Sequence, residues 1–247
     1  IIYPRKNQWS EILKRPTQTF NEIETIVNQV FEDVQSNGDQ AVRKYTKQFD
    51  KVSLSSLVVT EDEINTAVQK VSNELKEAIQ LAASNIEKFH KAQQSESVYQ
   101  ETMPGVVCWQ EKRPIQKVGL YIPGGTAPLF STVLMLAIPA KLSGCQEIIM
   151  CSPPNKEGNI ASEILYAANL CGVTSIYKVG GIQAISGLTF GTETIPKVYK
   201  IFGPGNQFVT VAKQMATKYG VAIDMPAGPS ELLVILLLYT SDAAHSL

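Results

Sequence analysis

The sequence predicts an α/β fold with a helix-rich N-terminal region. From residue 117 onward, short hydrophobic strands alternate with helical patterns, which is typical of βαβ units and a parallel sheet. Before residue 97, apolar residues instead recur at spacings of three and four, which predicts amphipathic helices. The two parts of the chain therefore differ in the periodicity of their apolar residues.

Four helices are expected in the N-terminal region. An apolar stripe that begins at Ile23 ends at Asn37-Gly38, a good helix terminator, and a second helix begins near Asp39. Thr60 and Glu63 have the spacing of a capping box for the third helix. The fourth helix carries an apolar stripe formed by Leu75, Ile79, Ala82, Ile86 and Phe89.

The β-structure is expected in three places. Residues 57–59 predict a short strand, and residues 97–115 predict a β-structured link between the two regions. The strands of the α/β part are expected at 118–122, 147–151, 175–179, 198–202 and 221–223. Among the intervening helices, one is expected to be capped by Asn159 and closed by Gly172.

Composition excludes several classes of protein. A net charge of −1 without a Lys/Arg cluster argues against nucleic acid as a partner. The longest apolar run, residues 232–239, is too short to cross a bilayer, and the N-terminus lacks the apolar core of a secretory signal. The cysteines form no Cys-x-x-Cys pair, which disfavours a disulfide framework and structural zinc. We expect a cytoplasmic protein without membrane contact.

Small-residue loops interrupt four hydrophobic stretches of the α/β part, at residues 122–125, 179–181, 202–205 and 226–229. Taken singly, each is a tight turn, and none matches the dinucleotide fingerprint Gly-x-Gly-x-x-Gly. Because the carboxyl ends of parallel strands meet at one edge of a sheet, the loops together predict a single ligand crevice there.

Three side chains are candidates to contact a ligand in this crevice. Tyr121 ends the first strand, Gln183 follows Gly180-Gly181, and Asn206 follows the loop at 202–205. Amides at helix starts can bind ribose or carboxamide groups, and a tyrosine adds a flat apolar face and a hydroxyl. The alternatives are a plain N-cap for Asn206 and a solvated helix position for Gln183.

No catalytic base is evident. Ser230 lacks the Gly-x-Ser-x-Gly elbow of a nucleophile. His90 flanks a helical stripe, where a structural or surface role is expected, and His245 lies in the last few residues. No tyrosine of the α/β part has a lysine four residues later, which disfavours a short-chain oxidoreductase. The residues thus predict a binding crevice without an acid–base group.

Three motifs carry a family resemblance: VGLYIPGGTAPLFSTV at 118–133, IFGPGN at 201–206 and IDMPAGPSE at 223–231. Together they resemble histidinol dehydrogenase, and the likeness extends to Ile235, a little over half of a typical member. The resemblance implies a Rossmann-like parallel sheet domain and an incomplete second α/β domain. It divides the chain into an N-terminal segment (1–20), an incomplete helix-rich domain (21–120), a Rossmann-like domain (121–229), and a return strand with a divergent tail (230–247).

The resemblance also implies an activity. Histidinol dehydrogenases oxidise L-histidinol to L-histidine through an aldehyde, with NAD and zinc, as swapped homodimers. It assigns Tyr121, Gln183 and Asn206 to NAD and Ser230 to the substrate. The zinc ligands and the Glu-His pair that acts as base are absent from this sequence, so no metal ligand can be assigned. We expect the isolated chain to be inactive; a nucleotide-binding remnant is the alternative reading.

The tail after Ile235 departs from the family pattern. Its apolar run at 232–239 would lack partner strands, which predicts poor solubility. We expect an assembly artefact in the underlying DNA sequence, with a natural truncation as the alternative.

Overall fold

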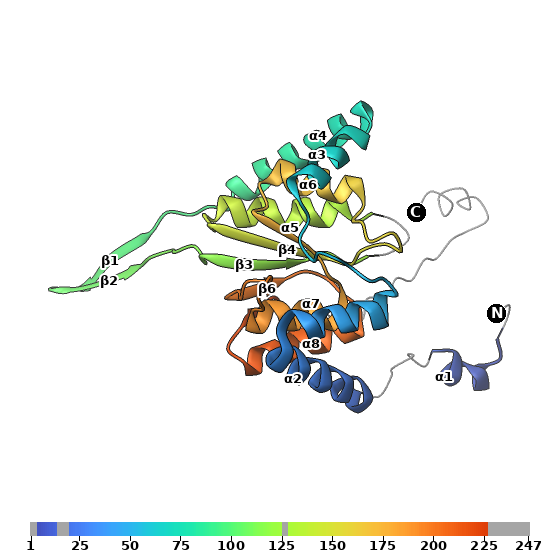
Figure 1. Cartoon of the computed structure of the whole chain (residues 1–247). Helices are drawn as coiled ribbons and strands as arrows, with labels where there is room; N and C mark the ends of the chain where they lie inside the picture. Colours follow the sequence, from blue (N-terminus) through green and yellow to red (C-terminus); the bar gives the residue numbers. More distant parts are fainter. Residues whose placement is uncertain (1–3, 14–19, 125–127, 227–247) are drawn as a thin grey trace.

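The computed structural model describes residues 4–13, 20–124 and 128–226 (Figure 1). Its centre is a five-stranded parallel sheet of order β5-β4-β3-β6-β7. The strands are β3 (Lys117–Tyr121), β4 (Glu147–Ser152), β5 (Ser175–Lys178), β6 (Lys200–Phe202) and β7 (Ala222–Ile223). The helices between them are α5 (Phe130–Leu142), α6 (Ser162–Cys171), α7 (Gly181–Phe190) and α8 (Gln207–Lys218). The predicted α/β class with a parallel sheet is confirmed, whereas the division into domains stays a prediction.

The chain builds this sheet outward from β3 in two directions. Strands β4 and β5 are added on one side of β3, and β6 and β7 on the other. As a result Leu120 of β3 pairs with Met150 on one side and with Phe202 on the other. In open α/β sheets, the point where the strand order reverses leaves a crevice at the carboxyl ends of the strands. Here that point lies between β3 and β6.

Helices cover both faces of the sheet (Figure 1). Helix α2 packs with α7 and α8 on one face, and α3 and α4 pack with α6 and α5 on the other. Successive strand residues point to opposite faces, so Leu120 enters one core and Tyr121 the other. The N-terminal elements are η1 (Lys6–Gln8), α1 (Trp9–Ile12), α2 (Phe20–Tyr45), the π-helical turn η2 (Thr46–Asp50), α3 (Glu61–Lys70) and α4 (Asn73–Lys91).

The break in α2 falls where the sequence predicts it. Gly38 has φ 50° and ψ −129°, so α2 consists of two helical pieces that meet at this residue. The backbone N–H of Asp39 donates to the Glu193 carboxylate at 2.7 Å. Glu193 thus satisfies an N–H group at the start of the second piece, as a capping residue does. The predicted end at Asn37-Gly38 and the new helix near Asp39 are confirmed.

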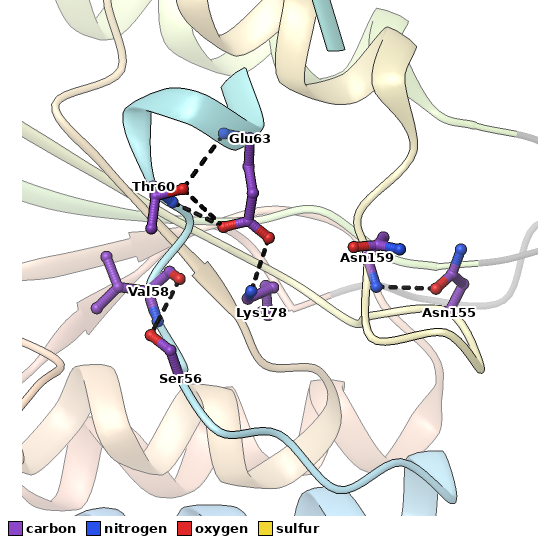
Figure 2. A network of polar contacts seen from close by, with 7 residues as sticks. All are labelled: Ser56, Val58, Thr60, Glu63, Asn155, Asn159 and Lys178. Atoms are coloured by element: carbon purple, nitrogen blue, oxygen red, sulfur yellow. Dashed lines mark hydrogen bonds and ion pairs between the residues drawn. The ribbon is translucent and has the colours of Figure 1, made fainter. Parts of the chain in front are cut away.

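The predicted capping box at the start of α3 is also confirmed (Figure 2). The Thr60 hydroxyl accepts from the Glu63 N–H at 3.2 Å, and the Glu63 carboxylate accepts from the Thr60 N–H at 2.8 Å. Glu63 also pairs with Lys178 at the end of β5, at 2.8 Å. This ion pair fixes α3 to the edge of the sheet.

Between α4 and β3 the chain forms an antiparallel hairpin that projects from the body (Figure 1). Its strands are β1 (Val98–Met103) and β2 (Val106–Gln110), and every residue of both is exposed. Tyr99 and Trp109 stack across the hairpin with ring centroids 6.3 Å apart. The expectation of β-structure within 97–115 is confirmed.

Three local expectations are wrong. Residues 57–59 form an isolated antiparallel bridge from Val58 to Tyr177 and not a strand; in it the Val59 N–H donates to the Ile176 carbonyl at 2.9 Å and the Lys178 N–H donates to the Leu57 carbonyl at 2.7 Å. Helix α6 begins after Ala161, and the N–H of Asn159 instead donates to the Asn155 side chain at 2.8 Å, which closes the preceding loop (Figure 2). Phe89 is 64% exposed, so it lies outside the buried stripe of α4.

Three further features bear on the sequence analysis: the end of α6, the state of the cysteines and the character of the helices. Gly172 ends α6 in the left-handed conformation, as predicted. All four cysteines are free thiols, of which Cys151 and Cys171 are buried. Within the ranges that the structure describes, no helix has the length and apolar character needed to cross a membrane.

Candidate functional site

A cleft of about 910 Å³ lies at the carboxyl ends of the parallel strands. Its lining comes from the segments that follow β3, β4, β5 and β6, and from the end of the α2–η2 segment. This is the position where the reversal of strand order predicts a ligand crevice. A volume of this size suits a ligand such as a nucleotide.

Tyr121 closes the inner wall of this cleft. Its side chain is buried, and its hydroxyl accepts a hydrogen bond from the N–H of Gly181, the first residue of α7, at 3.1 Å. Burial raises the pKa of Tyr121 to about 12, so the phenol stays protonated at neutral pH. The hydroxyl proton is therefore available for donation to a ligand.

Gln183 lies beneath the cleft and is fully buried in the first turn of α7. Its Nε2 donates to the Asp50 carboxylate at 3.0 Å, whereas its Oε1 has no hydrogen-bond partner among the described residues. The alternative of a solvated helix position is therefore wrong. Asp50 is the residue through which Gln183 connects to the cleft, since Asp50 itself lines it.

Asn206 lies at the start of α8 and lines the same cleft. Its Oδ1 accepts from the Val209 N–H at 3.1 Å, which makes it the N-cap of α8. The capping reading and the binding reading are compatible, because capping uses the oxygen and leaves the Nδ2 group as the donor for a ligand.

Two helix N-termini meet at this cleft. Gly181 begins α7 and Asn206 caps α8, and both line it. Free N–H groups and the helix dipole at such ends favour anionic groups, phosphates above all. None of the described lining residues is a lysine or arginine, so the helix ends are the feature of the lining that favours an anion.

The loop after β6 is held by a buried ion pair that sequence reasoning missed. Lys213 of α8 donates to the carbonyl oxygen of Gly203 at 2.7 Å and to the carboxylate of Asp224, which in turn accepts from the Gly203 N–H at 2.8 Å. Gly203 has φ 134°, and a Cβ there would lie 2.1 Å from the Tyr121 carbonyl oxygen. The loop can therefore cross this closely behind Tyr121 only with glycine at 203.

The remaining predicted positions lie elsewhere. Ser230 and His245 are outside the described residues. His90, on α4, is half-buried, and its Nδ1 lies 2.8 Å from the Gln93 side-chain oxygen. It is not one of the residues that line the cleft. Among the described residues no three His, Cys, Asp or Glu side chains are grouped so that they could hold a metal ion. The described part of the chain therefore does not fit a zinc site.

Asp50 is the functional candidate that the sequence did not single out. Burial raises its pKa to about 6, although the hydrogen bond from Gln183 opposes the rise. In the structure Asp50 ends the η2 turn and Lys51, the next residue, has the left-handed conformation with φ 60°. No spacing in the sequence reveals which part of the sheet the carboxylate meets.

Known proteins resemble this chain closely. The family model for histidinol dehydrogenase matches residues 13–241. The histidinol dehydrogenase of Bacteroides thetaiotaomicron is 57% identical over 239 residues, which cover 95% of this chain and 55% of that protein. The Escherichia coli K12 histidinol dehydrogenase is 54% identical over 231 residues, covering 92% of this chain and 52% of that protein.

A solved structure agrees with these sequence matches. The crystal structure of histidinol dehydrogenase from Elizabethkingia anophelis superposes with a TM-score of 0.84 at 57% identity, over 92% of this chain and 52% of that one. The chain thus spans about half the length of the relatives that it matches. A family match over most of its length, at this identity and with the same fold, shows that the chain belongs to the histidinol dehydrogenase family.

Proposed function

We propose that this chain forms the NAD-binding part of an enzyme that oxidises L-histidinol to L-histidine through the aldehyde. The observation that carries the proposal is that Tyr121 and Asn206 line one cleft at the switch point of the sheet, with Gln183 buried beneath it and connected to it through Asp50. The family supports the reaction type, and the cleft's two helix N-termini support a ligand with phosphates.

NAD, when bound, accepts the hydride that leaves the substrate carbon. The Tyr121 phenol stays protonated at neutral pH and donates a hydrogen bond to the nucleotide. Asn206 donates through Nδ2 while its oxygen caps α8. These contacts fix the orientation of the cofactor, and small errors in orientation slow hydride transfer steeply.

Zinc enters the proposal only for the complete enzyme, because the family resemblance implies that its ligands are absent from this sequence. The described residues contain no group that fits the metal, so we derive no step through it. Ser230 is proposed to contact L-histidinol. We also propose a homodimer in the cytoplasm for the complete enzyme; the exposed hairpin β1–β2 offers apolar surface for such an association.

A second candidate is a nucleotide-binding protein without turnover. The observation that favours it is that the described residues form a cleft, whereas no three His, Cys, Asp or Glu side chains among them are grouped to hold a metal ion. A catalytic zinc site needs about three protein ligands. We therefore predict that the 247-residue chain binds NAD yet forms no NADH from L-histidinol and zinc.

The test measures NAD binding by titration calorimetry and NADH formation by absorbance. Tyr121→Phe removes the phenol proton donor and should weaken NAD binding roughly tenfold. Tyr99→Phe, on the exposed hairpin, is the matched control and should bind NAD normally. NADH formation well above the blank would refute the prediction of inactivity, and failure of the chain to bind NAD would refute the proposed function.

A further inference from the structure

A carboxylate that has no cationic partner among the described residues lines the cleft. Asp50 ends the η2 turn and is the sole carboxylate among the described lining residues. Its Oδ2 accepts from Gln183 Nε2 at 3.0 Å, and this is its one hydrogen bond to the described part of the protein. A carboxylate can accept about four hydrogen bonds, so most of its capacity is unused.

Burial makes this incomplete pairing costly. A largely buried carboxylate is stabilised by a cation or by several hydrogen bonds, and Asp50 has one amide. Next to it, the buried Oε1 of Gln183 also has no partner among the described residues. Of these two groups, only Asp50 lines the cleft, so its unused acceptor positions face a ligand while the Gln183 carboxamide lies buried beneath it.

A bound ligand with O–H or N–H donors would supply the hydrogen bonds that the Asp50 carboxylate lacks. Phosphate oxygens are acceptors and carry negative charge, so they are repelled by a carboxylate. Ribose hydroxyls and a carboxamide NH₂ are donors, and NAD carries both groups. The α7 and α8 N-termini favour the phosphates, which leaves Asp50 suited to a neutral donor of the same ligand.

We propose that Asp50 is a ligand-binding residue of this cleft, which accepts a hydrogen bond from a hydroxyl or amide donor of the bound nucleotide and at the same time holds the Gln183 carboxamide in place. The proposal rests on the proposed function, because it takes NAD as the occupant of the cleft. It adds a contact from the N-terminal helical segment to those from the strand ends.

A pH dependence of NAD binding follows from this contact. The ionised carboxylate accepts two bonds, whereas the protonated form loses an acceptor site to its own proton. The titratable groups that face this position are Tyr121 and, behind it, Cys151; burial raises the pKa of Tyr121 to about 12 and that of the Cys151 thiol far above its ordinary range. Both stay neutral near pH 6. Lys47 and Lys51 neighbour Asp50 along the chain.

The experiment measures the NAD dissociation constant of the full 247-residue chain between about pH 5 and about pH 8. Since the pKa of Asp50 is raised to about 6, affinity should fall about tenfold as the pH drops from about 7 to about 5. Asp50→Asn keeps an oxygen to accept from Gln183 but turns the other group into a donor. This variant should bind NAD roughly tenfold more weakly at about pH 8 and lose the pH dependence.

Asp62→Asn, an exposed aspartate in the first turn of α3, is the matched control and should keep both the affinity and the pH profile. Equal NAD binding by Asp50→Asn and the unmodified chain at every pH would overturn the assignment of Asp50 alone. Absence of NAD binding by the unmodified chain would overturn the proposed function as well. A weaker Asp50→Asn variant whose pH profile is unchanged would reduce Asp50 to a structural role and so overturn the proposal.

Two ligand fragments distinguish the possible donors. ADP-ribose carries ribose hydroxyls without nicotinamide, and nicotinamide mononucleotide carries the carboxamide with one ribose. If Asp50→Asn weakens ADP-ribose as much as NAD, the donor is a hydroxyl of the ADP-ribose part. If only ligands with nicotinamide are weakened, the donor is the nicotinamide carboxamide. Both results support a direct contact.

Discussion

Two carboxylates near the ends of the strands differ in how fully they are paired. Asp224, after β7, accepts from the buried ammonium of Lys213 and from the Gly203 N–H. Asp50, at the end of η2, accepts from one amide and faces the cleft. A group whose hydrogen bonds are complete belongs to the scaffold, whereas a buried group with unused capacity points to a ligand. The contrast separates the residues that hold the site from those that we propose to use it.

The largest expected effect comes from the fully paired region. Lys213→Met leaves the Asp224 carboxylate without its cation, and breaking a buried pair in this way is strongly destabilising. Because Asp224 keeps partial access to water, we expect the free energy of unfolding to fall by roughly 2–4 kcal/mol. Urea denaturation at neutral pH measures this loss.

The control for that experiment is Lys218→Met on the same helix. Lys218 pairs with Glu24 at the surface and is 62% exposed, so its loss should change the free energy of unfolding by about 0.5 kcal/mol or less. Similar small losses for Lys213→Met and Lys218→Met would show that the buried pair adds nothing beyond a surface pair.

The second effect has the opposite sign. The folded-state pKa of Asp50 is raised from 3.8 to about 6, so the folded state binds this proton more tightly than the unfolded state. Stability therefore falls as the pH rises between these two values, and the whole penalty is present above about pH 6. Asp50→Asn removes the charge and should raise the free energy of unfolding by about 1–2 kcal/mol near pH 8, after allowance for partial solvent access.

Urea denaturation across about pH 4 to about pH 8 checks this prediction. The two proteins should converge in stability at the acid end, where Asp50 itself becomes neutral. A variant that is less stable than the unmodified chain at about pH 8 would contradict it. Higher stability together with weaker NAD binding is the combination expected of a functional group rather than a structural one.

The smallest effect concerns an intermediate pair, Glu63 with Lys178 (Figure 2). Burial alone would raise the pKa of Glu63, but the bonds from Lys178 and from the Thr60 N–H hold it below its ordinary value. The ionised form is thus stabilising above the ordinary glutamate pKa, and that stability is lost as the pH falls through the lowered folded value.

Glu63→Gln tests this pair, since glutamine keeps the capping box and removes the charge. We expect a loss of roughly 1 kcal/mol at neutral pH that vanishes in acid, measured by thermal unfolding at both ends of the range. Equal losses at neutral and acid pH would assign the effect to the cap instead of the charge.

Much of the fold was predictable because its signals are local. Gly38 and Gly172 mark helix ends through their backbone conformation, and Thr60 with Glu63 has a fixed spacing. Two of the four glycine loops line the cleft, at 122–125 and 179–181, because parallel strands bring their carboxyl ends to one edge. Tyr121 and Asn206 line the cleft for the same reason. Gly203, Pro204, Gly205 and Pro226 of the other two loops line a separate pocket, and residues 227–229 lie outside the described residues.

What could not be predicted depends on contacts between distant segments. Asp50 meets Gln183 only because α2 packs against α7, and no spacing in the sequence encodes that pairing. Likewise Asn159 has the side chain of an N-cap, yet the turn that Asn155 closes moves the start of α6 beyond it. Phe89 continues the spacing of the apolar stripe on α4, yet its side chain is 64% exposed, which the spacing does not reveal.

The order of the strands along the chain has a consequence for folding during translation. Tyr121 leaves the ribosome long before Gly203, whose loop crosses directly behind it. A nascent chain that has made β3, β4 and β5 therefore has an unprotected flank on β3 and half a binding surface. Only when β6 and α8 have emerged can that flank be covered, so the cleft cannot form until the last third of the chain has been made.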